Sequence, residues 1–198
     1  MKWIFKKIVI KILTYANRIN NKQDRIELKQ GFKKIGKNFF IGKDFIVFGT
    51  KYIEIGDDFI ATDRFRLEAL DQYGEGKFTP KVIIGNNVIF NTDVHIGCIN
   101  RVEIGDNCLF ASRIFIIDHH HGEPEAAILH IPPKDRLLVS KGPVIIENNV
   151  WVGEGVAIMP NVRIGKNSII ATNAVVTKDV PPNSVVAGVP AKVIKTMV

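Results

Sequence analysis

Apolar residues recur every six positions along most of this 198-residue chain. The repeat runs from about residue 32 to residue 180, and both its first and third positions are mostly apolar. Typical first positions are Val82, Val88, Val94, Val102, Cys108 and Ile114. Because side chains two residues apart in a strand share one face, each repeat predicts a short strand with a buried face.

The residues that follow each apolar pair predict a corner. Glycine often comes directly after the second apolar residue, and Asn or Asp follows it: Gly42, Gly56, Gly85, Gly97, Gly105, Gly153 and Gly165 mark these places. Such residues accept the left-handed backbone conformation of a sharp turn. Three strand-and-corner units close a triangle of about eighteen residues, and stacked triangles share a core that no single coil can form. The pattern therefore predicts an all-β fold, a parallel β-helix. An amphipathic helix would need a 3.6-residue period instead.

Four interruptions break the repeat. Two extra residues occur within Phe48–Tyr52 and again within Gly97–Asn100, while Glu68–Pro80 and 118–143 are longer excursions. Function in solenoids concentrates in such insertions. We expect an N-terminal amphipathic helix or cap over 1–30 and a β-helix domain over 31–198. That domain would carry the loop insertion 118–143 and a C-terminal tail, 181–198.

Charge and cysteine content limit the partners. The net charge of +7 suits an anionic ligand such as a CoA phosphate, an acidic glycan or a membrane surface. No basic strip interleaved with aromatic residues is present, so we expect no nucleic acid partner. Two cysteines are too few for a disulfide scaffold, which favours a reducing, cytoplasmic location. Cys108 falls on an inward position and is expected to be a small core residue.

The first thirteen residues, MKWIFKKIVIKIL, carry lysines at helical spacing beside a broad apolar face. The lysines interrupt the apolar run and no small-residue cleavage site follows, so a signal peptide is not indicated. Two alternatives stay open. This helix packs on the end of the solenoid, or it makes a peripheral contact with an anionic membrane.

The largest insertion opens with Asp118, His119, His120, His121 and Gly122. Histidine is the usual general base near neutral pH, and a nearby carboxylate can orient its ring. Consecutive histidines on an extended chain point to alternate sides, which weakens a metal site within one chain but not one shared between subunits. A general base, a metal ligand and a solvated loop all remain possible from the local sequence.

Three stretches resemble the hexapeptide-repeat acyltransferases, and most closely their sugar O-acetyltransferase branch of galactoside, maltose and capsule-modifying enzymes. They are IIDHHHG at Ile116–Gly122, the segment Val144–Gly165, and VVTKDVPPNSVVAGVPAKVIK at Val175–Lys195. The resemblance implies a left-handed coil and direct acetyl transfer from acetyl-CoA to a hydroxyl group, with a sugar or polysaccharide precursor as the default acceptor. It also implies a homotrimer with sites between chains, and no metal. A γ-carbonic-anhydrase-like zinc enzyme and a non-catalytic binding coil are the alternatives.

The resemblance also assigns roles by position. His119 matches the general base, with His121 as the competing choice and otherwise a substrate-binding residue. The remaining matches concern the donor and acceptor pockets: Asn91 and Trp151 for substrate, Gly153 and Glu154 at the thioester, Thr172 beside the pantetheine arm, and Thr177, Lys178 and Lys195 at the CoA end. As alternatives, Asn91 fits a plain corner residue, Trp151 a packing residue, and the two lysines solvated charges. Lys195 stands where the family often has Arg, and it lacks the bidentate fork.

Overall fold

The computed structural model describes residues 23–197. The chain divides into two compact units, residues 1–31 and 32–198. In the first unit, residues 23–31 form a helix. The amphipathic helix that we expect over residues 1–13, and with it the membrane contact, lies outside the described residues.

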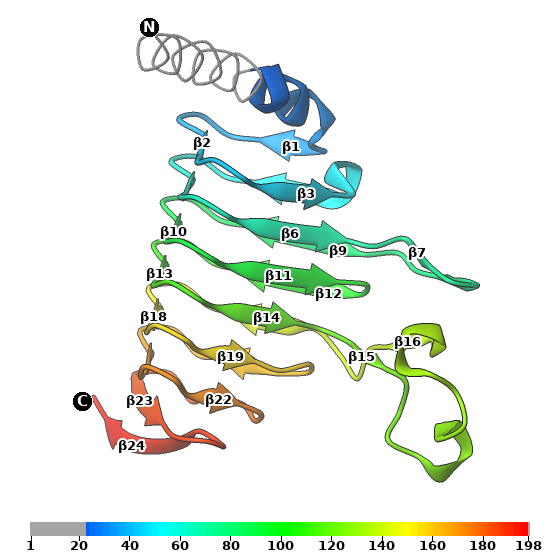
Figure 1. The fold of residues 1–198 in the computed structure, drawn as a ribbon. Coiled ribbons are helices and arrows are strands. Elements are labelled where there is room, and N and C mark those ends of the chain that lie inside the picture. The colour runs from blue at the N-terminus through cyan, green and yellow to red at the C-terminus, as the bar shows by residue number, and fades with distance from the viewer. Residues whose placement is uncertain (1–22, 198) are drawn as a thin grey trace, which may run out of the picture. The chain divides into compact units, whose positions relative to one another are not determined.

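The second unit is a parallel β-helix with three sheets, as the six-residue repeat predicts (Figure 1). Sheet A contains β1 (Lys34–Ile35), β4 (Ile53–Ile55), β9 (Lys81–Ile84), β12 (Arg101–Ile104), β17 (Val144–Ile146) and β20 (Arg163–Ile164). Sheet B contains β2 (Phe40–Ile41), β5 (Ile60–Ala61), β10 (Ile89–Phe90), β13 (Leu109–Phe110), β18 (Trp151–Val152), β21 (Ile169–Ile170), β23 (Ser184–Ala187) and β24 (Lys192–Thr196). Sheet C contains β3 (Ile46–Phe48), β6 (Arg66–Ala69), β11 (His95–Cys98), β14 (Phe115–Ile117), β19 (Ala157–Ile158) and β22 (Val175–Val176).

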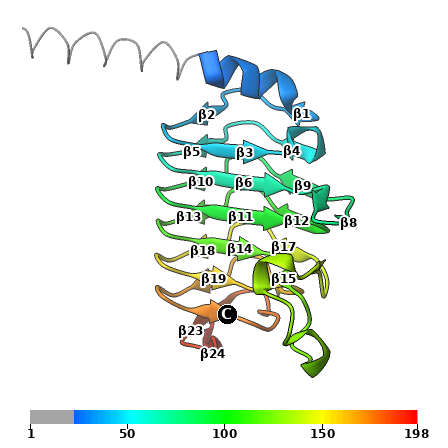
Figure 2. The same cartoon turned by 45° about the vertical axis from the view of Figure 1, so that its right-hand side comes forward.

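The inward positions of the three sheets form one continuous core. The turned view in Figure 2 shows the coils stacked as successive rungs. Four phenylalanines are fully buried and pack on one another from coil to coil: Phe59, Phe65, Phe90 and Phe110. Cys108 is buried in this core, and its thiol donates a weak hydrogen bond to the carbonyl of Glu147. The prediction for Cys108 is confirmed.

The corners correct one part of the sequence interpretation. Left-handed backbone angles occur at Asn and Asp, for example at Asn87 and Asn107, whereas the repeated glycines such as Gly85 have no positive φ. Those glycines are needed for close stacking instead. A Cβ on Gly85 would lie 2.8 Å from the carbonyl carbon of Gly105 in the next coil, which is closer than real Cβ atoms come. Side chains at the corners join the coils, as where Asn87 donates to Asn107 at 2.9 Å.

The C-terminal tail continues the fold beyond the predicted end of the repeat. β23 pairs in parallel with β21, and β24 then folds back antiparallel to β23. The last described residues therefore close one end of sheet B.

The two long excursions, 68–80 and 118–143, both leave the β-helix at the same corner, where the chain passes from sheet C to sheet A (Figure 1). The first is a hairpin of β7 (Gln72–Tyr73) and β8 (Gly76–Lys77). The second is the predicted insertion, in which β15 (His120–His121) pairs antiparallel with β16 (Leu138–Val139). Three short 3-10 turns complete the element set: η1 (Thr50–Tyr52), η2 (Ala126–Ile128) and η3 (Pro133–Asp135). The hydroxyl group of Tyr73 donates to the carbonyl of Lys134 at 2.7 Å, so hairpin and insertion touch.

Candidate active site

The site begins with a short interruption of the repeat after β11. The backbone N–H groups of Ile99, Asn100 and Arg101 all donate to the carboxylate of Asp118, at 2.8 to 3.2 Å. Successive N–H groups that converge in this way form an anion-binding concavity. Asp118 is completely buried. The two extra residues within Gly97–Asn100 thus create the socket for the first residue of the insertion.

The electrostatics of Asp118 follow from this socket. Burial is the largest influence on the pKa of Asp118 and raises it. Hydrogen bonds from His119 and from the backbone of Ile99 and Asn100 outweigh burial, so the pKa lies below its usual value. Asp118 is therefore a buried, ionised carboxylate at neutral pH.

His119 is fixed by this carboxylate. Its Nδ1 lies 2.8 Å from Oδ1 of Asp118, and since an ionised carboxylate only accepts, Nδ1 carries the proton. Nε2 is then the basic nitrogen. Nε2 has no hydrogen-bonding partner in the described part of the chain, and it is not one of the polar atoms that are buried without a partner. The residue as a whole is only 5% exposed. This geometry leaves Nε2 as the nitrogen of His119 that can accept a proton.

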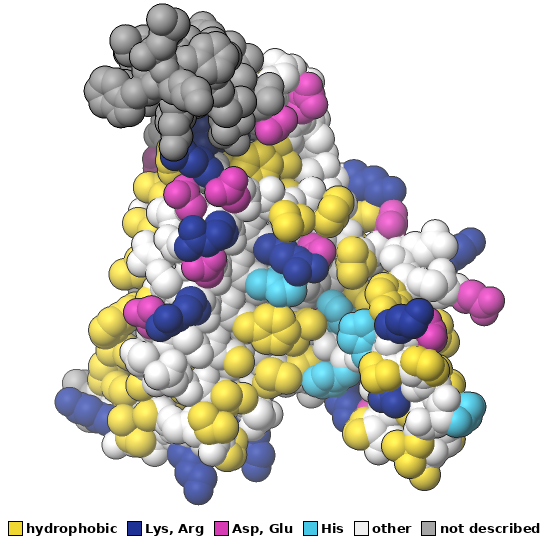
Figure 3. All heavy atoms as spheres, in the orientation of Figure 1, with side chains coloured by type: hydrophobic (Ala, Val, Ile, Leu, Met, Phe, Trp, Pro, Cys, Tyr) yellow, Lys and Arg dark blue, Asp and Glu magenta, His cyan; other side chains and the backbone are white. Residues whose placement is uncertain are grey.

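The other histidines of the insertion lie in different surroundings. His120 and His121 belong to β15, and the ring of His121 makes an edge-on contact with Tyr73 at 5.2 Å. His130 is exposed on the insertion. Figure 3 shows histidine side chains gathered between sheet C and the insertion. Among residues 23–197 no group of three or more His, Cys, Asp or Glu is arranged to hold a metal ion.

Most of the residues that are expected to contact the acetyl donor or the acceptor lie along two opposite margins of sheet C. At the corner between sheets B and C lie Asn91, the Gly153–Glu154 pair and Thr172. Gly153 and Thr172 occupy adjacent coils so closely that a Cβ on Gly153 would lie 2.7 Å from the Thr172 nitrogen. His119 lies at the far margin, between sheets C and A. One chain therefore does not bring His119 next to the predicted thioester corner.

Thr177 and Lys178 lie on the same margin as His119, further along the helix. They line a hollow of about 450 Å³ together with Arg163 and Asp179. Trp151 and Lys195 are placed differently, since both are exposed on sheet B, in β18 and β24. The predicted CoA residues thus fall into three groups in a single chain.

The backbone at the predicted thioester corner limits which N–H group can donate a hydrogen bond to an oxyanion formed from the thioester carbonyl. The N–H of Gly153 already donates to the carbonyl of Ile170 at 2.8 Å, which excludes it from that role. The N–H of Glu154 has no backbone partner in residues 23–197. The Glu154 side chain pairs with Arg113 at 2.7 Å. Of the two residues that the sequence indicates, only Glu154 has an N–H available.

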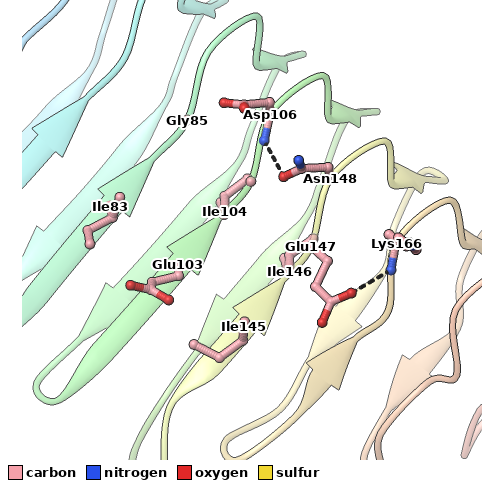
Figure 4. A pocket seen from close by; sticks show the side chains of 11 residues that line it. Ile83, Gly85, Glu103, Ile104, Asp106, Ile145, Ile146, Glu147, Asn148 and Lys166 are labelled. Atoms are coloured by element: carbon pink, nitrogen blue, oxygen red, sulfur yellow. Dashed lines mark hydrogen bonds between the residues drawn. The ribbon is translucent and has the colours of Figure 1, made fainter.

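A second hollow lies on the outer face of sheet A (Figure 4). His119 is not among the residues that line it. The carboxylates of this hollow are already engaged: Glu103 pairs with Arg101, and Asp106 accepts from the backbone of Asn86. Glu147 accepts from the backbone of Lys166 and pairs with Arg163, and the backbone of Asp106 donates to Asn148. We therefore place the candidate site on sheet C. No helix in residues 23–197 is both long and apolar enough to cross a bilayer.

Comparison with known proteins identifies the class that this fold and site define. A family model described as bacterial transferase hexapeptide (six repeats) matches residues 143–178. The putative lipopolysaccharide biosynthesis O-acetyl transferase WbbJ of Escherichia coli K12 is 39% identical over 148 residues, which cover 72% of this chain and 71% of that protein. The chain therefore belongs to the hexapeptide-repeat acyltransferase family, in its O-acetyltransferase branch.

Solved structures agree with this assignment. A maltose O-acetyltransferase from Clostridium difficile 630 matches with a TM-score of 0.57 and 27% identity, covering 95% of this chain and 86% of that one. A galactoside acetyltransferase solved in complex with coenzyme A matches with a TM-score of 0.52 and 27% identity, covering 85% of this chain and 67% of that one. The predicted fold, a left-handed parallel β-helix, and the predicted enzyme class, an O-acetyltransferase, are confirmed.

Two parts of the site escaped the sequence interpretation. Asp118 was visible in the DHHHG run, but nothing in the sequence showed that its carboxylate would meet three N–H groups eighteen or so residues earlier. The repeat pattern predicts a corner glycine at Gly97, whereas in the structure this glycine provides the space for His119. A Cβ on Gly97 would lie 3.2 Å from Cε1 of the His119 ring.

Proposed function

We propose that this chain transfers an acetyl group from acetyl-CoA to a hydroxyl group of a sugar or polysaccharide precursor. His119 acts as the general base in a direct transfer. The observation that carries the proposal is the buried Asp118–His119 pair, whose 2.8 Å hydrogen bond leaves Nε2 as an available base. The names of the relatives, which include O-acetyltransferases for lipopolysaccharide, maltose and galactoside, support the acceptor class.

In the proposed reaction, Nε2 of His119 takes the proton of the acceptor hydroxyl group as its oxygen attacks the thioester carbonyl. The tetrahedral intermediate carries an oxyanion, which the Glu154 N–H stabilises. When the C–S bond breaks, the imidazolium returns the proton to the CoA thiolate. Asp118 stabilises the imidazolium between these steps without taking its proton. General base assistance of this kind accelerates a reaction about 10²–10⁴-fold.

A site that uses His119 and Glu154 together requires a second copy of the chain, because they lie on opposite margins of sheet C. We propose a homotrimer in which each site combines His119 of one chain with the Glu154 corner of its neighbour. Sheet B offers a surface for such contact. Its outer face carries an exposed apolar column in strand register: Phe40, Ile60, Leu109 and Trp151. Large apolar surfaces of this kind mark interaction sites.

The remaining predicted residues have roles in this scheme. The exposed Lys178 beside Arg163, and Lys195 on β24, suit the phosphates of CoA. Thr172 lies beside the path of the pantetheine arm, and Thr177 contacts the CoA end. Asn91, His121 and Trp151 contact the acceptor.

The test compares His119→Ala with His130→Ala, which removes an exposed histidine from the same insertion. CoA release from acetyl-CoA is followed with a panel of sugar acceptors. We expect at least a 100-fold lower turnover in His119→Ala, unchanged acetyl-CoA affinity by calorimetry, and no loss in His130→Ala. Unchanged turnover in His119→Ala would reject it as the base. A lack of acetyl-CoA binding by the unaltered protein would reject the reaction itself.

A further inference from the structure

A second carboxylate–imidazole pair lies on the outer face of sheet C. Nε2 of His95, on β11, lies 3.1 Å from Oε2 of Glu68, on β6. Arg66 holds the same carboxylate with a hydrogen bond from Nη2 to Oε1 and an ion-pair contact from Nε to Oε2, each 2.9 Å long. The side chain of Glu68 is 12% exposed and that of His95 is 31% exposed. The donor and acceptor roles assigned above do not use this pair.

Strand register places this pair beside His119. Glu68, Gly97 and Ile117 lie opposite one another on β6, β11 and β14. They and His95 occupy outward positions, because the residues between them on the strands, Ile96 among them, are buried. The ring of His119 packs over Gly97 from one side, and Glu68 with His95 borders Gly97 from the other. The two imidazoles thus flank a small patch of sheet C at Gly97, which the side chain of Ile117 also borders.

Each of the two imidazoles has one nitrogen hydrogen-bonded to a carboxylate and the other nitrogen without a hydrogen-bonding partner in the described residues. A carboxylate oxygen accepts, so Nε2 of His95 donates to Glu68 and its Nδ1 is left as an acceptor. Nδ1 has no hydrogen-bonding partner within residues 23–197, and it is not one of the polar atoms that are buried without a partner. Burial lowers the pKa of His95, the charges of Arg66 and His119 lower it further, and Glu68 opposes them. At neutral pH His95 is therefore a neutral imidazole whose Nδ1 can accept a hydrogen bond.

We propose that His95, held by Glu68 and Arg66, is a specificity-determining residue that binds a second hydroxyl group of the acceptor. This inference rests on the proposed acetyl transfer at His119. Two acceptor nitrogens on one face select a molecule that offers two O–H donors on neighbouring carbons. A sugar ring has such pairs of hydroxyl groups, whereas a simple alcohol has one, and a phosphate or carboxylate at the same place has no proton to donate. His95 therefore selects a neutral polyol segment over a monohydroxy or anionic group.

The experiment uses the full chain, acetyl-CoA, and a panel of methyl hexopyranosides with their single-deoxy analogues. For the best substrate, kcat/KM is compared with that of the analogue lacking the hydroxyl group next to the acetylated one. We expect the unaltered protein to disfavour the deoxy analogue about 10- to 100-fold, since one unpaired polar group at the site costs this much. In His95→Ala and His95→Asn the ratio should approach one, with an unchanged KM for acetyl-CoA. His130→Ala should keep the discrimination.

Several outcomes separate this inference from the proposed function. If both His95 variants fold and retain the discrimination, the role of His95 is wrong while acetyl transfer at His119 stands. Ligand-observed NMR with CoA present reads acceptor binding without turnover. There, His119→Ala should keep the preference for the intact pyranoside and His95→Asn should lose it. If the unaltered protein neither binds nor acetylates any pyranoside, both the sugar acceptor and the role of His95 are refuted.

Discussion

The imidazole of His119 lies against the backbone of Gly97, on the neighbouring strand of sheet C. A methyl group at Gly97 would come within 3.2 Å of Cε1 of His119, tighter than most real contacts, so the ring would have to move by a few tenths of an ångström. The general base of the proposed reaction is therefore positioned by two features. Asp118 fixes its protonated nitrogen, and Gly97 leaves the space in which the ring lies.

We expect Gly97→Ala to fold and to lower kcat about 10- to 100-fold, because a small displacement of a positioned group costs this much. The KM for acetyl-CoA should not change. In the double variant with His119→Ala, the Gly97 substitution should add almost nothing, since it acts through His119. Steady-state kinetics of the two single variants and the double variant provide this test. Fully additive losses would show that Gly97 acts elsewhere.

Asp118→Asn should lower kcat by about 10²–10⁴-fold, because an amide does not hold Nδ1 of His119 in its protonated form. Acceptor and donor binding should change little. Steady-state kinetics of the double variant with His119→Ala test this assignment, because a residue that acts through His119 adds almost nothing once that imidazole is gone. A double variant much less active than His119→Ala alone would contradict a role through His119.

The same carboxylate predicts how stability depends on pH. The pKa of Asp118 is depressed in the folded chain, so its stabilisation is present above the unfolded value of about 3.9 and is lost as pH falls through the folded value. Asp118→Asn should therefore be less stable at pH 7 by about 1.5–3 kcal/mol and lose less stability on acidification. Denaturant unfolding between pH 3 and 7 measures both effects. Parallel curves for the two proteins would refute the depressed pKa.

Shared sites predict complementation between two inactive variants. His119→Ala removes the base, and Thr172→Trp, at an exposed position, blocks the proposed pantetheine path at the other margin. When equal amounts are unfolded together and refolded, about one quarter of the sites in random trimers combine an intact base with an intact groove. We expect activity to return to about that fraction. Refolded mixtures without activity, or a monomer in sedimentation analysis, would argue against the shared site.

Both cysteines should be unreactive in the native protein. Cys98 and Cys108 are buried. Burial raises the pKa of Cys98, the charge of Asp118 raises it further, and burial raises the pKa of Cys108 to about 11. We expect a thiol-specific reagent at pH 8 to label neither residue until denaturant is added, and then to label both. Rapid native labelling would place at least one thiol outside the core.

The sequence by itself determined the β-helix, because a six-residue alternation of apolar side chains and corners can bury its surface only by stacking coil on coil. It also located the insertion with His119 and the corner at Gly153 and Glu154. Only the tertiary structure decided that three backbone N–H groups donate to Asp118 and that Gly97 leaves space for the imidazole of His119. It also decided that Glu68 holds His95 close to that imidazole. These relations join strands in different coils. Which residues meet there depends on the lengths of the intervening insertions and on strand register, and neither follows from the local period.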